Sequence, residues 1–180
     1  MKERLKEIIK KYSYEKREVT LASGRKSNFY FDGKQTTLNA EGAYLVGKLM
    51  FNIIKNLPIK IEAVGGPTIG ADPIATSIAL VSYLEKEPIN AFIVRKEPKG
   101  HGKQLWIEGD KFLPEGSTVA IVEDVITTGG SILKAIEIVE NQGYRVGAVI
   151  VLVDREEGGK ENIEKKGYKL YSVLKKSEII

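Results

Sequence analysis

Two adjacent acids and the Thr–Thr–Gly–Gly–Ser turn that follows them are the residues of this sequence best suited to chemistry. Glu123 and Asp124 come directly after an apolar run, 119–122, which predicts a buried strand. The turn occupies residues 127–131, and apolar residues at helical spacing follow it over 132–139. A glycine-rich turn between a strand and a helix directs backbone N–H groups and the positive end of the helix dipole at one point, where an anion can bind.

The side chains around this turn suit a phosphorylated sugar. Thr127, Thr128 and Ser131 offer hydroxyl donors to phosphate oxygens. Glu123 and Asp124 can accept hydrogen bonds from sugar hydroxyls. The stretch therefore predicts a site for a ribose 5-phosphate. It is neither a Walker loop nor a dinucleotide fingerprint, because the Gly-Lys-Ser/Thr and G-x-G-x-x-G spacings are missing.

Alternating strands and helices are expected to position these residues. Such alternation predicts an α/β fold with a central, mostly parallel sheet that helices cover on both faces. Ligands of such sheets bind beyond the carboxyl ends of the strands, and each predicted central strand ends in a glycine-rich or charged loop. The predicted strands are 61–64, 89–94, 118–122, 146–153 and a last edge strand at 168–174, while short strands are expected within 19–38.

The segment from Arg95 to Lys103 concentrates positive charge after one of these strands. It holds four Lys or Arg residues and His101, the single histidine of the chain. Two glycines and a proline disfavour a helix or a strand, so we expect a loop. One interpretation is a lid that closes over a polyanion such as pyrophosphate. The alternative is a solvated loop in which His101 has a structural role.

Two further loops follow predicted strands. Residues 65–72 are glycine-rich, and they form either an anion-binding nest or an ordinary strand–helix turn. Residues 154–159 contain Arg155, for which the ordinary role would be a surface ion pair with Glu156 or Glu157.

Composition excludes several classes of protein. The 180 residues are expected to form one domain, and the absence of cysteine excludes disulfides and thiolate chemistry. No apolar run is long enough to cross a membrane and the N-terminus lacks a signal-peptide pattern, so a cytoplasmic protein with no membrane partner is expected. The net charge of +4 comes from interspersed Lys and Glu, so nucleic acid is not an expected partner.

These motifs resemble those of the type I phosphoribosyltransferases, and most of all their orotate branch. The acid pair with its turn resembles the family's signature for phosphoribosyl pyrophosphate (PRPP), and residues 23–31, 95–102 and 154–159 resemble further segments of the orotate branch. The resemblance covers nearly the whole chain. It implies the type I phosphoribosyltransferase fold in a single domain, 1–180, in which residues 1–38 form a small N-terminal hood over the base site.

The resemblance also implies roles for individual residues. Orotate would be bound by Thr127, Arg155, Tyr30 and Phe31. Catalytic roles would fall to Lys96, Lys99, His101 and Asp124, with His101 either donating a proton to pyrophosphate or forming a neutral hydrogen bond. PRPP would be bound by Arg95, Lys96, Lys99 and His101 on the pyrophosphate side and, on the ribose 5-phosphate side, by Glu123, Asp124, Val125, Ile126, Thr127, Thr128, Gly129, Gly130 and Ser131.

The implied reaction is transfer of the 5-phosphoribosyl group from PRPP to orotate, a step of pyrimidine nucleotide (UMP) synthesis. Mg²⁺ would be bound mainly through PRPP, with no protein ligand assigned. The implied partner is a second copy of the chain, because in this family the lid reaches across a dimer interface. The sequence departs from the best-known bacterial pattern at Ala22 and at Ile69-Gly70, where two cationic contacts are missing.

Three alternatives remain at this point. A phosphoribosyltransferase for another nucleobase would share the acid pair and the turn, but Arg155 and the hood would have no carboxylate to bind. A non-catalytic PRPP-sensing regulator that binds nucleic acid would need a recognition element, and Lys2–Tyr12 offers only one short helix. A purely structural protein would have no use for the charged loops.

Overall fold

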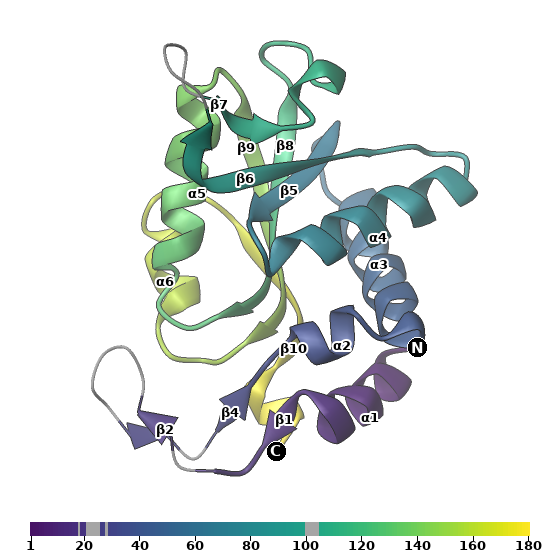
Figure 1. The fold of residues 1–180 in the computed structure, drawn as a ribbon, viewed down its shortest axis with the longest axis vertical. Helices are drawn as coiled ribbons and strands as arrows, with labels where there is room; N and C mark the ends of the chain where they lie inside the picture. The colour runs from purple at the N-terminus through teal and green to yellow at the C-terminus, as the bar shows by residue number, and fades with distance from the viewer. Residues whose placement is uncertain (18, 21–25, 28, 100–104) are drawn as a thin grey trace.

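A six-stranded sheet forms the centre of the protein, and helices cover both of its faces (Figure 1). The computed structural model describes residues 1–17, 19–20, 26–27, 29–99 and 105–180. Along the sheet the strands are arranged in the order β10–β9–β8–β5–β6–β7, and all neighbours are parallel except β6 and β7. The predicted α/β fold with a mostly parallel sheet is therefore confirmed.

The strands of the sheet are β5 (Ala63–Pro67), β6 (Asn90–Lys99), β7 (Leu105–Glu108), β8 (Thr118–Ile126), β9 (Arg145–Asp154) and β10 (Leu170–Lys175). The α-helices are α1 (Lys2–Tyr12), α2 (Lys34–Thr37), α3 (Ala40–Lys55), α4 (Ala71–Leu84), α5 (Gly130–Asn141) and α6 (Gly159–Glu164), and two 3₁₀ turns lie at Asp110–Phe112 and Lys176–Glu178. Within the described part of the chain, none of these helices has the length and apolar character needed to cross a membrane.

Alternation along β8 explains why the sheet is buried on both faces. Val119 and Ile121 pack in the apolar cluster that includes the inner face of α5. Ala120 and Val122 point the other way and pack in the cluster that includes α3 and α4. All four side chains are fully buried, and burial of a side chain of the size of Val or Ile contributes about 1.5–3 kcal/mol. The centre of the sheet is therefore a rigid base for the end of β8 and for the turn that leads into α5.

The N-terminal residues form a small layer beside the carboxyl ends of the central strands (Figure 1). In this layer β1 (Tyr14–Glu15) pairs antiparallel with β4 (Tyr30–Phe31), and β2 (Val19–Thr20) pairs antiparallel with β3 (Lys26–Ser27). The apolar face of α1, including Leu5, is buried in the same cluster as α3 and α4. This layer is thus anchored to the main core.

Residues 34–37, which lie within the region expected to form short strands, form the helix α2 instead. The residue before this helix is Gly33, and no side chain caps the helix there. Asp32 contributes to its start, since its carboxylate accepts a hydrogen bond from the backbone N–H of Lys34 at 3.2 Å and so satisfies a donor that the first turn leaves without a helical partner.

The prediction of a loop from Arg95 onward is also partly wrong, because residues 95–99 continue strand β6. They form an antiparallel ribbon with β7, which joins Lys99 to Leu105, and the register is irregular between Val94 and Lys99. Proline lacks an N–H donor but is tolerated at such an irregularity near a sheet edge, which accounts for Pro98 inside the strand. Residues 100–104 lie outside the described residues.

Candidate active site

Glu123 and Asp124 lie inside β8 rather than after it, because β9 continues to pair with β8 as far as Ile126. On the other side of β8, pairing with β5 stops at Ile121. From that residue onward one edge of β8 has no neighbouring strand, so the carboxylates face an opening between β8 and the loop after β5. They are nevertheless only 7% and 6% exposed. The sheet thus holds two buried acids at the carboxyl end of a central strand, where ligands of such sheets bind.

A cavity of about 390 Å³ lies at this opening. The nine residues that the sequence predicted to hold ribose 5-phosphate, from Glu123 to Ser131, all line it. Lys34, Pro67, Thr68 and Gly70 complete the lining. The acid pair and the phosphate turn therefore share one cavity, as expected from the sequence.

The turn presents backbone donors to this cavity. Gly129 precedes α5 in the left-handed conformation, with φ +88°, which glycine adopts without strain. No side chain caps α5 at this end. Because the first turn of a helix leaves N–H groups without helical partners, those of α5 are available to an anion.

The two carboxylates perturb each other strongly. Burial raises the pKa of Glu123 from 4.5 to about 8, and the nearby charges of Asp124 and Asp72 add to the rise. Burial also raises the pKa of Asp124, and the nearby Lys34 ammonium opposes this rise. A buried pair of carboxyl groups with raised pKa values in a cavity is typical of a functional site, because burial of such groups is costly unless a ligand uses them.

Two glycines make this packing possible, and sequence reasoning assigned them no role in it. A Cβ on Gly70 would lie 2.4 Å from Glu123 Oε1 and 2.9 Å from Asp124 Oδ1. A Cβ on Gly33 would lie 2.7 Å from both Cβ and Oδ2 of Asp124. The small residues of the 65–72 loop did predict a close backbone approach, but to a ligand rather than to the acid pair.

Lys34 is the other lining residue that the sequence did not reveal. It begins α2, and its Nζ lies 2.7 Å from Asp32 Oδ1. No sequence pattern around Lys34 indicated that it would line a binding cavity. Only the contact between Gly33 and Asp124 brings it to the cavity.

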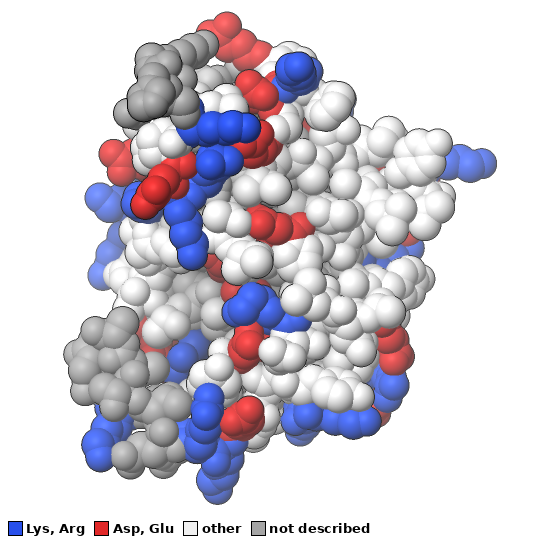
Figure 2. All heavy atoms as spheres, in the orientation of Figure 1, with Lys and Arg blue, Asp and Glu red and all other residues white. Residues whose placement is uncertain are grey.

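The cations at the end of β6 do not line this cavity in the described part of the chain. The Arg95 guanidinium donates to Glu108 Oε1 at 2.8 Å and to the Glu97 carbonyl at 3.1 Å, so it is held on the β6–β7 ribbon. Figure 2 shows Lys and Arg side chains gathered among acids over the region where Figure 1 places β6 and β7. Lys96 and Lys99 belong to this ribbon, and His101 lies outside the described residues.

Arg155 lies at the end of β9, buried against the N-terminal layer. Its guanidinium donates to the Phe29 carbonyl at 3.3 Å, forms an ion pair with Glu157 at 2.9 Å and lies over the Phe29 ring at 5.3 Å. The expected surface ion pair is therefore a buried one. The structure thus joins Arg155 to the hood strands rather than to solvent.

The two predicted aromatic residues lie on β4 of the same layer. Phe31 is buried and stacks on Phe29, with ring centroids 6.1 Å apart. Tyr30 is partly exposed, and Arg17 lies over its ring at 3.8 Å. Neither lines the cavity described above. Ala22, one of the two departures from the bacterial pattern, lies outside the described residues.

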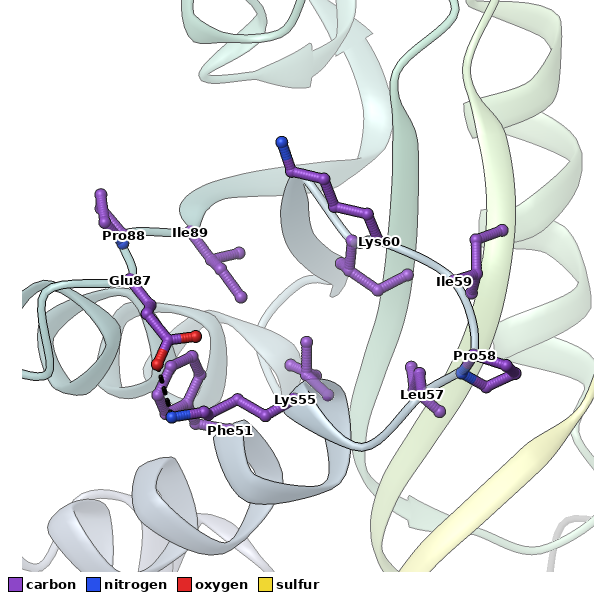
Figure 3. Close-up of a pocket in the computed structure, with 11 residues that line it drawn as sticks. Phe51, Lys55, Leu57, Pro58, Ile59, Lys60, Glu87, Pro88 and Ile89 are labelled. Atoms are coloured by element: carbon purple, nitrogen blue, oxygen red, sulfur yellow. Dashed lines mark hydrogen bonds and ion pairs between the residues drawn. The ribbon is translucent and has the colours of Figure 1, made fainter.

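A larger cavity, of about 640 Å³, lies away from these residues, among the C-terminal ends of α3 and α4 and the loops after them (Figure 3). Its walls are mostly aliphatic, and its charged side chains are Lys55, Lys60 and Glu87. Lys55 and Glu87 form an ion pair at 2.5 Å. This cavity holds neither an acid pair nor a glycine-rich turn, so size does not identify the active site here.

No metal centre is evident among the residues that the structure describes, since no three or more His, Cys, Asp or Glu side chains there are grouped to hold an ion. Glu123 and Asp124 are the two carboxyl groups of the described cavity wall. A metal ion in this cavity would need most of its ligands from a bound substrate.

Sequence comparison relates the whole chain to known enzymes. A family model described as the phosphoribosyl transferase domain matches residues 34–176. The chain is 48% identical to the orotate phosphoribosyltransferase of Aquifex aeolicus, over 99% of this chain and 97% of that protein. It is 46% identical to the orotate phosphoribosyltransferase of Sorangium cellulosum, over 99% of this chain and 93% of that protein.

Structure comparison agrees with the sequence. The orotate phosphoribosyltransferase of Mycobacterium tuberculosis in complex with PRPP matches with a TM-score of 0.82 at 36% identity, over 99% of this chain and 98% of that one. The orotate phosphoribosyltransferase of Aeropyrum pernix matches with a TM-score of 0.82 at 34% identity, over 97% and 95% of the two chains. The adenine phosphoribosyltransferase of Leishmania donovani, at 19% identity and a TM-score of 0.71, is similar in fold alone.

Proposed function

Because the chain belongs to the orotate phosphoribosyltransferases of the phosphoribosyl transferase family, we propose that it transfers the 5-phosphoribosyl group of PRPP to N1 of orotate. The products are orotidine 5′-monophosphate and pyrophosphate, and the step belongs to pyrimidine nucleotide synthesis. One observation carries this proposal: a buried acid pair and an uncapped helix N-terminus line the same cavity.

The cavity accounts for recognition of the ribose 5-phosphate. Backbone N–H groups at the start of α5 and the hydroxyls of Thr127, Thr128 and Ser131 bind the terminal phosphate. Glu123 and Asp124 accept hydrogen bonds from the 2′- and 3′-hydroxyls. The phosphate at one end and the diol at the other fix the sugar in one orientation.

Catalysis in this site is mainly electrostatic. As the bond between C1′ and the pyrophosphate breaks, positive charge develops on the ribose ring and negative charge on the departing group. Asp124 stabilises the cationic ring, because a carboxylate held in a buried cavity interacts more strongly than one in water. Orotate N1 then attacks C1′, and no dedicated general base is required.

The departing pyrophosphate needs cations, which the end of β6 and the segment after it supply. Arg95, Lys96, Lys99 and His101 bind it when this lid closes, and closure also excludes water from the ribosyl cation. The described lid residues lie on the β6–β7 ribbon and do not line the cavity of their own chain. We assign the lid to the cavity of a second copy, as the family resemblance implies, which makes the enzyme a homodimer.

Magnesium fits this site as an ion carried by PRPP. Glu123 and Asp124 are the acidic side chains that line the cavity within the described residues, and the sugar hydroxyls that they bind lie beside the pyrophosphate. When bound, the ion neutralises part of the charge of the leaving group. The protein residues orient the sugar diphosphate that holds it.

Orotate lies between the cavity and the N-terminal layer. Thr127 lines the cavity, and Arg155 faces the layer through its contacts with Phe29. A guanidinium can bind the orotate carboxylate with two parallel hydrogen bonds. Tyr30 and Phe31 complete the cover of the base from β4, and residues 1–38 act as a hood within a single domain.

A spectrophotometric assay of orotate consumption with PRPP and Mg²⁺ tests this proposal. Orotate should be consumed, whereas uracil, adenine and hypoxanthine in parallel reactions should not react at a comparable rate. Turnover of one of those bases in place of orotate would support a phosphoribosyltransferase of another specificity. Absence of any turnover, with DNA or RNA shifted in a gel, would support the regulatory alternative.

A further inference from the structure

The acid pair is enclosed by backbone rather than by side chains on two sides. A Cβ on Gly33 would lie 2.7–2.9 Å from atoms of Asp124. A Cβ on Gly70 would lie 2.4 Å from Glu123 Oε1 and 2.9 Å from Asp124 Oδ1, so a side chain at either position would displace the acid pair. A lysine at position 70, where the best-known bacterial pattern has one, would require Glu123 to move. The loop after β5 therefore supplies no cation here, whereas another element that lines the cavity carries one.

Lys34 stands next to one of these glycines and lines the same cavity. It is the one cation among the cavity-lining residues that the structure describes. Its side chain is 40% exposed, so the ammonium can move within the cavity mouth. Asp32 holds it at 2.7 Å, and this carboxylate, with a further contribution from Asp124, raises the pKa of Lys34. Lys34 is therefore charged and close to the acid pair.

The orientation of the sugar places the pyrophosphate on this side of the cavity. The 5-phosphate occupies the turn at 127–131, and the 2′- and 3′-hydroxyls face Glu123 and Asp124. Because C1′ is bonded to C2′, the group attached to C1′ lies beyond the acid pair as seen from the turn. Lys34, Thr68 and Gly70 line the same cavity, and Gly33 and Gly70 lie against the acid pair.

We propose that Lys34 is a PRPP-binding residue whose ammonium contacts the diphosphate group and takes the place of the cation that the loop at Gly70 lacks. This inference rests on the proposed function. In the free enzyme Asp32 holds the ammonium beside the cavity, and with PRPP bound the ammonium donates to phosphate oxygens. Such charge-assisted hydrogen bonds are stronger than those between neutral groups.

The competing explanation is that Lys34 only stabilises the start of α2 through Asp32. Exposed ion pairs of this kind contribute about 0–1 kcal/mol. Gln35 provides a matched control, since its Nε2 donates to the other oxygen of Asp32 at 3.2 Å. It is on the same helix but does not line the cavity.

Steady-state kinetics of Lys34→Met, Lys34→Arg and Gln35→Ala separate the two explanations. Lys34→Met keeps the aliphatic stem without the charge, and it should raise KM for PRPP about tenfold or more, with KM for orotate and Tm little changed. Lys34→Arg should recover most of the PRPP affinity, because the charge is retained. Gln35→Ala should leave KM for PRPP as in the wild type. Calorimetric titration of PRPP with Mg²⁺ should show the same loss of affinity in Lys34→Met.

Two outcomes would overturn the role of Lys34. One is a Lys34→Met enzyme with the PRPP affinity of the wild type. The other is an equal rise in KM for PRPP in Gln35→Ala, which would assign the effect to α2 as a whole. If Lys34→Met does not fold, a Lys34→Gln enzyme with unchanged PRPP affinity would overturn it as well. A wild-type chain that does not consume orotate would instead overturn the proposed function.

Discussion

At the scale of the residue, the buried carboxyl of Glu123 links stability to pH. Its pKa in the folded chain is about 8, above the ordinary 4.5 that applies when unfolded. Between these values the folded state binds more protons than the unfolded state, so stability falls as pH rises. The contribution is fully present below 4.5 and is lost as pH passes through 8.

Glu123→Gln should remove this dependence, because an amide does not titrate. In urea unfolding, the variant should gain stability relative to the wild type between pH 5 and pH 9, by roughly a few kcal/mol. The difference between the two proteins reports the titration of Glu123 together with its effect on the neighbouring Asp124. An equal change of stability with pH in both proteins would show that the carboxyl titrates normally.

Arg155 permits a second prediction at this scale. A lysine cannot reproduce two parallel hydrogen bonds to a carboxylate, so Arg155→Lys should raise KM for orotate by about tenfold or more while KM for PRPP changes little. Arg145→Lys is a suitable control, because Arg145 is exposed at the start of the same strand. Parallel losses of affinity for both substrates in Arg155→Lys would assign Arg155 to the structure of the hood instead.

The residues of the acid pair and the turn could be predicted from sequence because they are contiguous. Nine consecutive residues, 123–131, line one wall of the cavity, so a pattern within one short segment was enough to predict them. Gly33, Lys34 and Gly70 could not be predicted in this way. Their roles depend on contacts between segments far apart in the chain, as when Gly33 packs on Asp124.

At the scale of the element, the start of α2 packs closely against β8 through Gly33 and Asp124. Gly33 has φ −61° and ψ −26°, which alanine adopts freely. Gly33→Ala therefore adds a methyl group without straining the backbone, and it tests the packing of Gly33 against Asp124. The new methyl group would meet Asp124 Cβ at 2.7 Å. Crowding of this kind typically costs about 1–3 kcal/mol.

We therefore expect Gly33→Ala to lower both Tm and kcat, since α2 must move away from β8 and Asp124 moves with it. Thermal unfolding and the orotate assay measure the two effects. Gln35→Ala on the same helix, at an exposed position, should lower neither appreciably. Wild-type stability and activity in Gly33→Ala would mean that α2 packs less closely than described.

The elements that sequence patterns predicted well are those with continuous apolar runs, such as the buried parts of β8 and β9. The pattern failed where polar residues continue a strand. Glu123 and Asp124 interrupt the apolar run, but β8 continues through them and Glu123 pairs with Val151 of β9. Residues 95–99 continue β6, and Lys99 pairs with Leu105 of β7 at the sheet edge. Strand pairing is decided by the neighbouring strand, which a local pattern does not contain.

At the scale of the whole molecule, the face of α4 that points to solvent supports the proposed homodimer. Leu80, Tyr83 and Leu84 lie on this face at helical spacing and are 61%, 72% and 67% exposed. Contiguous apolar surface of this kind marks interaction sites. A second copy is the partner that the shared lid requires, because the described lid residues do not line their own cavity.

The double variant Tyr83→Glu/Leu84→Glu should therefore weaken dimerisation. Light scattering should give about twice the chain mass of 19.9 kDa for the wild type and a smaller mass for the variant at the same concentration. Buried charges that lack partners oppose association, and the monomer should lose activity because no neighbouring lid reaches its cavity. Tyr12→Glu, at a tyrosine 46% exposed on α1, should keep both the mass and the activity of the wild type. A fully active monomeric variant would instead show that each chain closes its own lid over its own cavity.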